Sequence, residues 1–229
     1  MAGRNDLGSL LRRSLETCRD HPIAFVSIAA PFLPLEVAAA LARGPWHLVT
    51  SIGVLVVSQL PFAALVRAAS VATHGGKPSF GDSYAAVLTR ARDILEVTIR
   101  HLGATLLLTA SLVGMPWGLN IFVRWFFGIQ GVVLYSLTPK DALRFSSQIV
   151  KGSWWRTFMA LLIPVTLGQI PVWVPVVLFR SFSPLVLVMS ALVGVVLTPF
   201  LICFYTLWFF RLVDLRNGTE NGELSAFQI

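Results

Sequence analysis

Glu36 and Arg124 are the residues of this sequence best suited to chemistry, because each is a charged side chain inside a long apolar stretch. A lone charge at the centre of a membrane helix costs about 2.5 to 3.5 kcal/mol on insertion scales, so it needs a partner or water. At about 1.5 Å rise per residue, the two lie within about 3 Å of the same depth. We expect Glu36 and Arg124 to pair, or to share a polar cluster with Asn120. The cluster is either a structural ion pair or a site for a substrate or proton.

Three glutamines also lie in apolar stretches that contain prolines. Helices broken at mid-membrane are typical of transporters, where unwound segments contact the substrate or ion. Proline is equally tolerated in membrane helices that only pack, because neighbours satisfy the freed backbone groups. Both interpretations stay open, and in the first a polar path would be lined by Gln59, Gln130 and Gln169.

Other chemistry-bearing residues are scattered. The spacing of the histidines matches no metal-binding motif, and no phosphate-binding or nucleophile motif occurs. The two cysteines are far apart and are interpreted as unpaired thiols. We therefore expect no catalytic residues, no metal site, no cofactor and no enzymatic activity. The residues concerned are His21, His47, His74, His101, Cys18 and Cys203.

The composition indicates what holds these residues in place. The chain has 229 residues, of which 55% are hydrophobic and only 13% are charged, unlike a soluble globular domain. A membrane-spanning helix needs about 20 mostly apolar residues. The sequence thus predicts an all-α polytopic membrane protein with six transmembrane helices arranged as three hairpins. The expected spans are residues 22–41, 46–66, 97–114, 116–137, 157–178 and 184–210.

The distribution of positive charge predicts the orientation. Of the 18 lysines and arginines, all but Arg43, Arg124 and Arg180 fall on one side of the expected spans. Lysine and arginine are enriched in cytoplasmic loops. Both termini are therefore expected in the cytoplasm, and the excess of 18 basic over 11 acidic residues reflects those loops rather than nucleic-acid binding.

Three polar segments on the cytoplasmic side have apolar residues at helical spacing, each just before a hairpin. We expect each to be an amphipathic helix on the membrane surface whose cations contact anionic lipid headgroups. The expected apolar faces are Leu7, Leu10, Leu11, Leu15 and Cys18; Phe80, Tyr84, Val87, Leu88, Ala91 and Leu95; and Ala142, Leu143, Ser146, Ile149 and Val150. The expected headgroup contacts are Arg12, Arg13, Arg90, Arg92, Arg144 and Lys151.

Helix-start signals support two of these segments. Ser79 and Thr138 each precede an aspartate by three residues, which predicts an N-cap, and Pro139 suits a first helical position. A unit of one surface helix and two spans would then repeat over residues 5–73, 79–137 and 138–211. These units make up one membrane domain, residues 1–216, followed by a polar cytoplasmic tail, residues 217–229.

Two stretches of the chain carry a resemblance to a known family. One runs from Arg124 to Arg156 and includes Leu-Thr-Pro-Lys-Asp-Ala-Leu-Arg-Phe-Ser and Val-Lys-Gly-Ser-Trp-Trp-Arg, and the other is the closing Phe210–Arg216. They resemble the six-helix membrane domain that occurs alone or fused to bacterial glycerophosphodiester phosphodiesterases. In that domain a glutamate often stands at the position of Tyr135. The resemblance implies a bacterial membrane protein, expected in the cytoplasmic (inner) membrane, and it does not imply phosphodiesterase chemistry.

Two functions are consistent with these expectations. The first is a non-enzymatic accessory, scaffold or assembly subunit that contacts anionic lipid and other membrane protein subunits. The alternative is a small transporter or lipid-handling protein with a polar site at Glu36 and Arg124.

Overall fold

The computed structural model describes residues 7–41, 46–162, 166 and 184–219, and over these ranges the regular structure is all α-helical, as predicted. Residues 154–162 are helical as well. The named helices are α1 (Leu7–Asp20), α2 (Pro22–Ala29), α3 (Phe32–Leu41), α4 (Trp46–Val57), α5 (Gln59–Thr73), α6 (Phe80–Leu88), α7 (Ala91–Thr109), α8 (Met115–Trp125), α9 (Gly128–Tyr135), α10 (Pro139–Val150) and α12 (Pro184–Thr219).

Three helical segments in the described part of the chain are long and apolar enough to cross a membrane. Leu48–Thr73 combines α4 and α5, Met115–Tyr135 combines α8 and α9, and Leu192–Gly218 lies within α12. Their mean hydropathies are 2.0, 1.3 and 2.1. They correspond to the second, fourth and sixth expected spans, so the chain has the character of a multi-pass membrane protein.

The other three expected spans lack one continuous apolar helix among the described residues. The first is divided into α2 and α3 at Ala30 and Pro31, and its apolar part, Pro22–Leu35, is short. The third falls in α7, whose first half carries Glu96 and Arg100. Most of the fifth, residues 163–165 and 167–178, lies outside the description. Six spans therefore remain a prediction.

Prolines account for two of the helix interruptions, as the sequence indicates. Pro34 cannot donate to the Ala30 carbonyl, and the chain turns at Ala30 and Pro31 between α2 and α3. Pro61 cannot donate to Val57, and the α4 to α5 boundary lies at Ser58. Pro199 is accommodated inside α12, while Pro164, Pro171 and Pro175 are not among the described residues.

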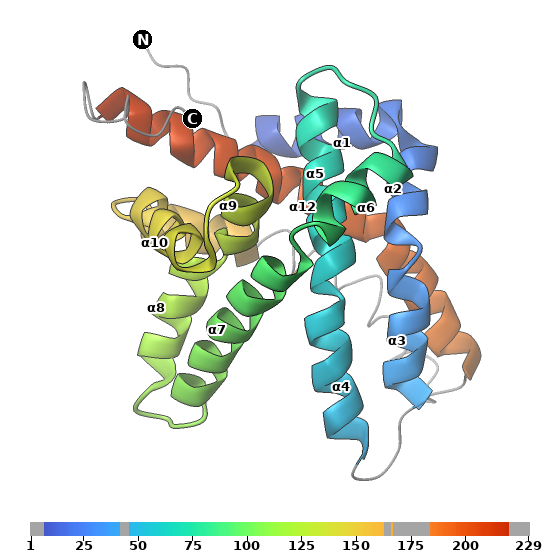
Figure 1. The fold of residues 1–229 in the computed structure, drawn as a ribbon, viewed down its shortest axis with the longest axis horizontal. Coiled ribbons are helices and arrows are strands. Elements are labelled where there is room, and N and C mark those ends of the chain that lie inside the picture. Colours follow the sequence, from blue (N-terminus) through green and yellow to red (C-terminus); the bar gives the residue numbers. More distant parts are fainter. Residues whose placement is uncertain (1–6, 42–45, 163–165, 167–183, 220–229) are drawn as a thin grey trace.

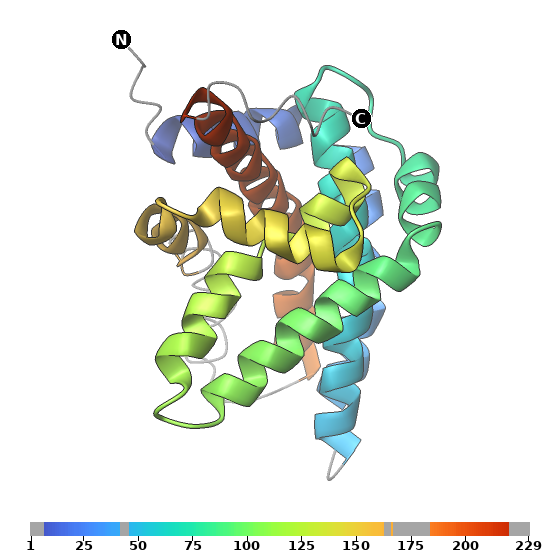
Figure 2. The same cartoon turned by 60° about the vertical axis from the view of Figure 1, so that its left-hand side comes forward.

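The helices place their connections at two ends of the molecule (Figure 1). At one end lie α1, α6 and the C-terminal turns of α5 and α12, and at the other lie the turn between α7 and α8 and the adjoining ends of α3 and α4. Helix α10 lies across the end of the α7–α8 hairpin, with which it is in contact (Figure 2). This crossing brings a basic helix against two apolar ones.

The interior consists of two apolar clusters. One joins α2, α5, α7 and α9 through side chains such as Ile28, Leu65 and Val97. The other joins α8, α10 and α12 through Val123, Ile149 and Phe209, and α1 adds Leu10 to it. Fully burying such a side chain contributes about 1.5 to 3 kcal/mol, so both clusters stabilise the packing of these helices.

Glycines allow close helix contact where side chains would not fit. A Cβ on Gly118 would lie 2.5 Å from Thr109 Cγ2, so α8 approaches α7 closely at this point. A Cβ on Gly131 would lie 3.2 Å from that of Ala142, which brings α9 against α10. A Cβ on Gly128 would lie 2.9 Å from Leu143 Cδ2, so both glycines of α9 allow its close packing on α10.

The three predicted amphipathic helices have different outcomes. In α10 the buried residues are the predicted Ala142, Leu143, Ser146, Ile149 and Val150, and Thr138 is the N-cap. This face packs on α7, α8 and α9, so it is covered by protein.

The second predicted face is divided between two helices, so the prediction of one continuous helix was wrong. Helix α6 ends at Leu88 and α7 begins at Ala91, so no single helix reaches Leu95. Phe80 and Leu88 are exposed, and Ser79 is the N-cap by position but makes no side-chain capping bond. Packing of α6 on α5 buries Val87, which belongs to the predicted face, together with Ser83, which does not.

The first predicted face is only partly used within the protein. In α1, Leu10 and Ser14 are buried against α12, whereas Leu15 is 60% exposed. A helix that packs sideways on another helix covers a narrower stripe than one lying on a membrane.

Candidate functional site

Helix α10 is built so that one face is buried and the other carries polar groups. Thr138 caps it by accepting a hydrogen bond from the Asp141 amide and donating one of 2.6 Å to the Asp141 carboxylate. Pro139 occupies the first turn, where its missing N–H costs nothing. Burial of the apolar face then leaves a polar stripe at helical spacing: Lys140, Arg144, Ser147, Gln148 and Lys151.

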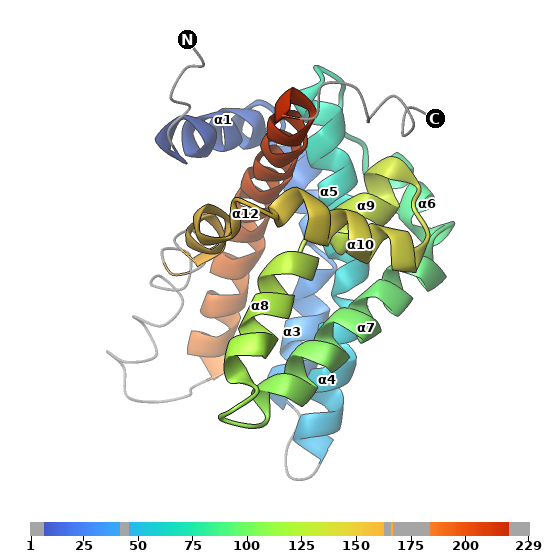
Figure 3. The ribbon, with the colours of Figure 1, turned by 90° about the vertical axis from the view of Figure 1, so that its left-hand side faces the viewer.

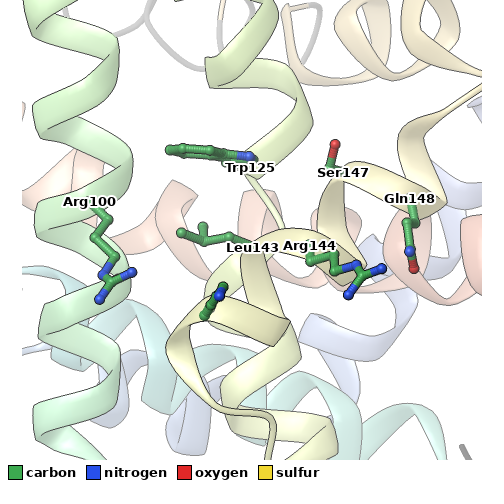
Figure 4. Close-up of a pocket in the computed structure, with 7 residues that line it drawn as sticks. Arg100, Trp125, Leu143, Arg144, Ser147 and Gln148 are labelled. Atoms are coloured by element: carbon green, nitrogen blue, oxygen red, sulfur yellow. The ribbon is translucent and has the colours of Figure 1, made fainter.

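This stripe forms one wall of a basic pocket with a volume of about 480 Å³, open to the surface (Figure 4). Helix α7 contributes Arg100, and the last residue of α8 contributes Trp125. Three cations therefore line one cavity, and none of its described lining residues is acidic. The lining residues are Arg100, Trp125, Lys140, Leu143, Arg144, Ser147 and Gln148.

Two of the residues that line the pocket have polar partners just outside it. Arg100 forms a 2.6 Å ion pair with Glu96, one turn earlier in α7. Both side chains are well exposed, so the pair is worth at most about 1 kcal/mol. Gln148 accepts a 3.0 Å hydrogen bond from Arg216 of α12, which brings a further cation to the pocket wall.

The chemistry of this arrangement is that of an anion site. Lys140 and Arg144 are like charges four residues apart on a helix, a spacing that destabilises by about 0.2 to 0.5 kcal/mol. A bound anion would remove this repulsion and accept charge-assisted hydrogen bonds from both side chains. Trp125 and Leu143 add an apolar wall suited to the carbon atoms attached to such an anion.

Ser146 fixes the position of Trp125 at the pocket. The chain is not helical at Phe126 and Phe127, between α8 and α9. The buried Ser146 hydroxyl accepts a 3.1 Å hydrogen bond from the Phe127 amide and donates a 2.7 Å bond to the Arg124 carbonyl. The interrupted backbone is thereby satisfied from α10, which holds the end of α8 against it.

The predicted headgroup residues do not form one patch. Arg144 lines the pocket, and Lys151, Arg13 and Arg92 are exposed. Arg12 forms an ion pair with Glu16 in α1. Arg90 donates a 3.2 Å hydrogen bond to the Ser136 carbonyl, so part of its function is to hold α9 near the start of α7.

The predicted intramembrane pair is not tested, because the Glu36 side chain lies outside the described residues. Its helix, α3, and the helix of Arg124, α8, are on opposite sides of the molecule in Figure 1. Figure 3 shows the same two helices from the side of α8. Arg124 and Asn120 are partly exposed. The pairing stays a prediction.

The predicted polar path also stays a prediction. Gln59 donates a 3.1 Å hydrogen bond to Leu55 of α4, one turn earlier. Gln130 is fully buried, and its amide has no protein hydrogen-bond partner among the residues described. Gln169 lies outside them.

Of the three cations in the basic pocket, Arg144 was predicted from the sequence as a contact residue, whereas Arg100 and Lys140 were missed. The spacing of Lys140 and Arg144 in an amphipathic helix could have identified one wall. Arg100 is far from both in sequence and joins them only through the packing of α10 on α7. No family model, curated protein or solved structure matches this chain when it is compared with each of the three.

Proposed function

We propose that this chain is a non-enzymatic, multi-pass protein of a bacterial cytoplasmic membrane, an accessory or assembly subunit whose basic pocket binds the headgroup of an anionic phospholipid. The observation that carries the proposal is the cavity lined by Arg100, Lys140 and Arg144 together with Trp125. The resemblance to six-helix bacterial membrane domains supports the same cellular setting.

The shape and composition of the pocket favour a lipid over a soluble anion. A phosphate group would contact the lysine and arginines, and the attached glycerol would lie against Trp125 and Leu143. Tryptophan is enriched at membrane interfaces, where its ring lies at headgroup depth. The pocket adjoins the end of α8, which is part of an apolar segment long enough to cross a membrane. A phosphodiester headgroup at the bilayer surface fits these surroundings.

Exposed apolar side chains support the membrane setting. On α4 these include Leu48 and Ile52, and near the α7–α8 turn they include Leu107 and Leu112, which are 78% and 92% exposed. Surfaces of this kind are stable in lipid. The proposal includes six spans, with both termini cytoplasmic and the α7–α8 turn on the opposite side.

Binding to defined lipids tests the headgroup site. The purified chain would be titrated in neutral detergent with phosphatidylglycerol or phosphatidylcholine, and bound lipid counted by native mass spectrometry. Lys140→Gln with Arg144→Gln should weaken phosphatidylglycerol binding at least about tenfold, because charge-assisted hydrogen bonds contribute about 1.5 to 3 kcal/mol each. Binding of phosphatidylcholine should not change.

The matched control removes the same charge elsewhere. Arg67 and Lys77 are exposed and lie outside the pocket, so Arg67→Gln with Lys77→Gln should leave phosphatidylglycerol affinity within about twofold of wild type. An equal loss in both double variants would show that net charge, and not the pocket, determines binding. The proposed site would then be abandoned.

Cysteine accessibility tests the topology. In a variant lacking the native cysteines, Lys77→Cys should react with an impermeant maleimide only from the cytoplasmic side. Leu112→Cys should react only from the other side. Labelling of both positions from one side would contradict the six-span arrangement.

The accessory role is tested on the exposed face of α4, which places Ile52 and Leu55 toward the surroundings of the protein. A photo-crosslinking residue at Ile52 should give one discrete protein adduct in intact cells. The same photo-crosslinking residue placed at Ser70 of α5, near the other end of the Leu48–Thr73 segment, is the control. If Ile52 crosslinks only to lipid, the proposed role as a subunit would be contradicted. The proposed headgroup site would not be affected.

A further inference from the structure

The chain contains two cysteines, and the fold brings them together. Cys18 is in the last turns of α1 and Cys203 is in α12, 185 positions later, yet their sulfur atoms are 3.4 Å apart. Both are free thiols. A disulfide has an S–S distance of about 2.05 Å, so closure requires an approach of about 1.4 Å.

The two thiols differ in access to reagents. Cys203 is fully buried in the apolar cluster that joins α2, α5, α7 and α9, whereas Cys18 packs at the edge of that cluster and is partly exposed. A hydrogen bond with Cys203 lowers the pKa of Cys18 from its ordinary value, although burial opposes this effect. Reactive thiols combine partial exposure with thiolate character, so Cys18 is the one that reagents can reach.

We propose that Cys18 and Cys203 form a redox-active pair, which closes to an intramolecular disulfide on reaction with a small-molecule disulfide and thereby links α1 covalently to α12. The proposal is independent of the lipid site. It adds a modification site at the contact between α1 and α12.

The reaction is an exchange in two steps. The Cys18 thiolate attacks one sulfur of the small disulfide, forming a mixed disulfide and releasing one small thiolate. The Cys203 sulfur, already adjacent, loses its proton and attacks the Cys18 sulfur, which expels the second small thiolate. Both small thiolates take up a proton. The two protein thiols are oxidised by two electrons, and the small disulfide is reduced to two thiols.

The consequence of closure follows from the packing of α1. This helix is held on α12 by one stripe of side chains that includes Leu10 and Ser14, while Leu15 remains exposed. A bond at Cys18 lies near the C-terminal end of α1, just before α2. Oxidation would therefore hold the connection between α1 and α2, where the first expected span begins, in place against α12.

The test uses the full chain in lipid nanodiscs, treated with oxidised glutathione and analysed by intact mass. Wild type should lose two hydrogen atoms, carry no glutathione, and return to its original mass with dithiothreitol. Cys203→Ser should retain one glutathione on Cys18, because no second thiol can displace it. Cys18→Ser should stay unmodified while folded, because Cys203 is buried.

The proposal is tested on the wild-type protein, so the test does not depend on whether each cysteine variant folds. Proteolysis after oxidation should yield one peptide pair linked through Cys18 and Cys203. Two free thiols, or a stable glutathione adduct on wild type under conditions that fully modify Cys203→Ser, would overturn it. Reaction of Cys18→Ser at the rate of Cys203→Ser would contradict the assignment of Cys18 as the entry thiol.

Discussion

The Ser146 hydroxyl donates a 2.7 Å hydrogen bond to the carbonyl oxygen of Arg124, 22 residues earlier in the sequence. The same hydroxyl accepts from the Phe127 amide, so one side chain satisfies both backbone groups that the interruption between α8 and α9 exposes. An unsatisfied buried backbone group costs about 1 to 3 kcal/mol.

Ser146→Ala should therefore lower the free energy of unfolding by about 1 to 3 kcal/mol, and more if both backbone groups lose their partners. The measurement is thermal or denaturant unfolding of the purified chain in detergent. Ser147→Ala, at the neighbouring position on the pocket wall, is the control and should change stability by less than about 0.5 kcal/mol. Equal effects of the two substitutions would contradict the bridging role of Ser146.

Two glycines in the α7–α8 hairpin should respond oppositely to alanine. A Cβ on Gly118 would lie 2.5 Å from Thr109 Cγ2 and 3.2 Å from the Thr105 carbonyl oxygen, so Gly118→Ala should destabilise by about 1 to 3 kcal/mol. A Cβ on Gly103, within α7, meets nothing within 4 Å. Gly103→Ala should be neutral or stabilise by up to about 1 kcal/mol, since alanine favours helix. A stabilising Gly118→Ala would show that α7 and α8 are not in close contact.

Removing the two predicted N-cap hydroxyls should lower the free energy of unfolding by different amounts in the same assay. Thr138→Ala removes a hydroxyl that bonds both the amide and the carboxylate of Asp141, and should cost about 0.5 to 2 kcal/mol. Ser79→Ala removes a hydroxyl that makes no capping bond, and should cost less than about 0.5 kcal/mol. A larger loss at Ser79 would mean that α6 is capped in a way the structure does not show.

Ionisation of Tyr84 should lower the stability of the protein at alkaline pH. Burial raises the pKa of Tyr84 to about 12, and its hydroxyl donates a 2.9 Å hydrogen bond to the Ile28 carbonyl. Because the folded pKa lies above the unfolded value of about 10, this contribution to stability is complete below pH 10 and is lost as the pH rises to about 12.

Tyr84→Phe should therefore lose less stability than wild type between pH 10 and 12, while losing about 0.5 to 1.5 kcal/mol at neutral pH with the hydrogen bond. Melting temperatures at several pH values give both quantities. The same pH dependence in wild type and Tyr84→Phe would exclude Tyr84 as the titrating group.

Local sequence signals predicted some parts of this structure fully. In α10, the capping threonine, the proline and the apolar spacing all agree, and its start and buried face were predicted correctly. In α6, the same kind of spacing identified the buried Val87 but not Ser83, and Phe80 and Leu88 of the predicted face are exposed. Periodicity identifies a helix more reliably than it identifies which side the neighbours will cover.

The site could be predicted only in part, since its members meet through tertiary packing. Arg144 was expected to contact headgroups, but Arg100 joins it only because α10 crosses α7. Similarly, no spacing rule connects Cys18 with Cys203. Residues that act within one helix are visible in sequence, whereas residues contributed by separate helices become visible with the fold.

The origin of the basic pocket on three helices has a consequence for the lifetime of the protein. Arg100, Trp125 and Arg144 converge only after α7, α8 and α10 have packed, so an unfolded chain offers no equivalent site. A ligand that binds only the folded state raises the free energy of unfolding in proportion to the logarithm of its concentration. On the proposed function, cells that make less anionic phospholipid would therefore degrade this protein faster, and its abundance would follow the lipid composition of the membrane.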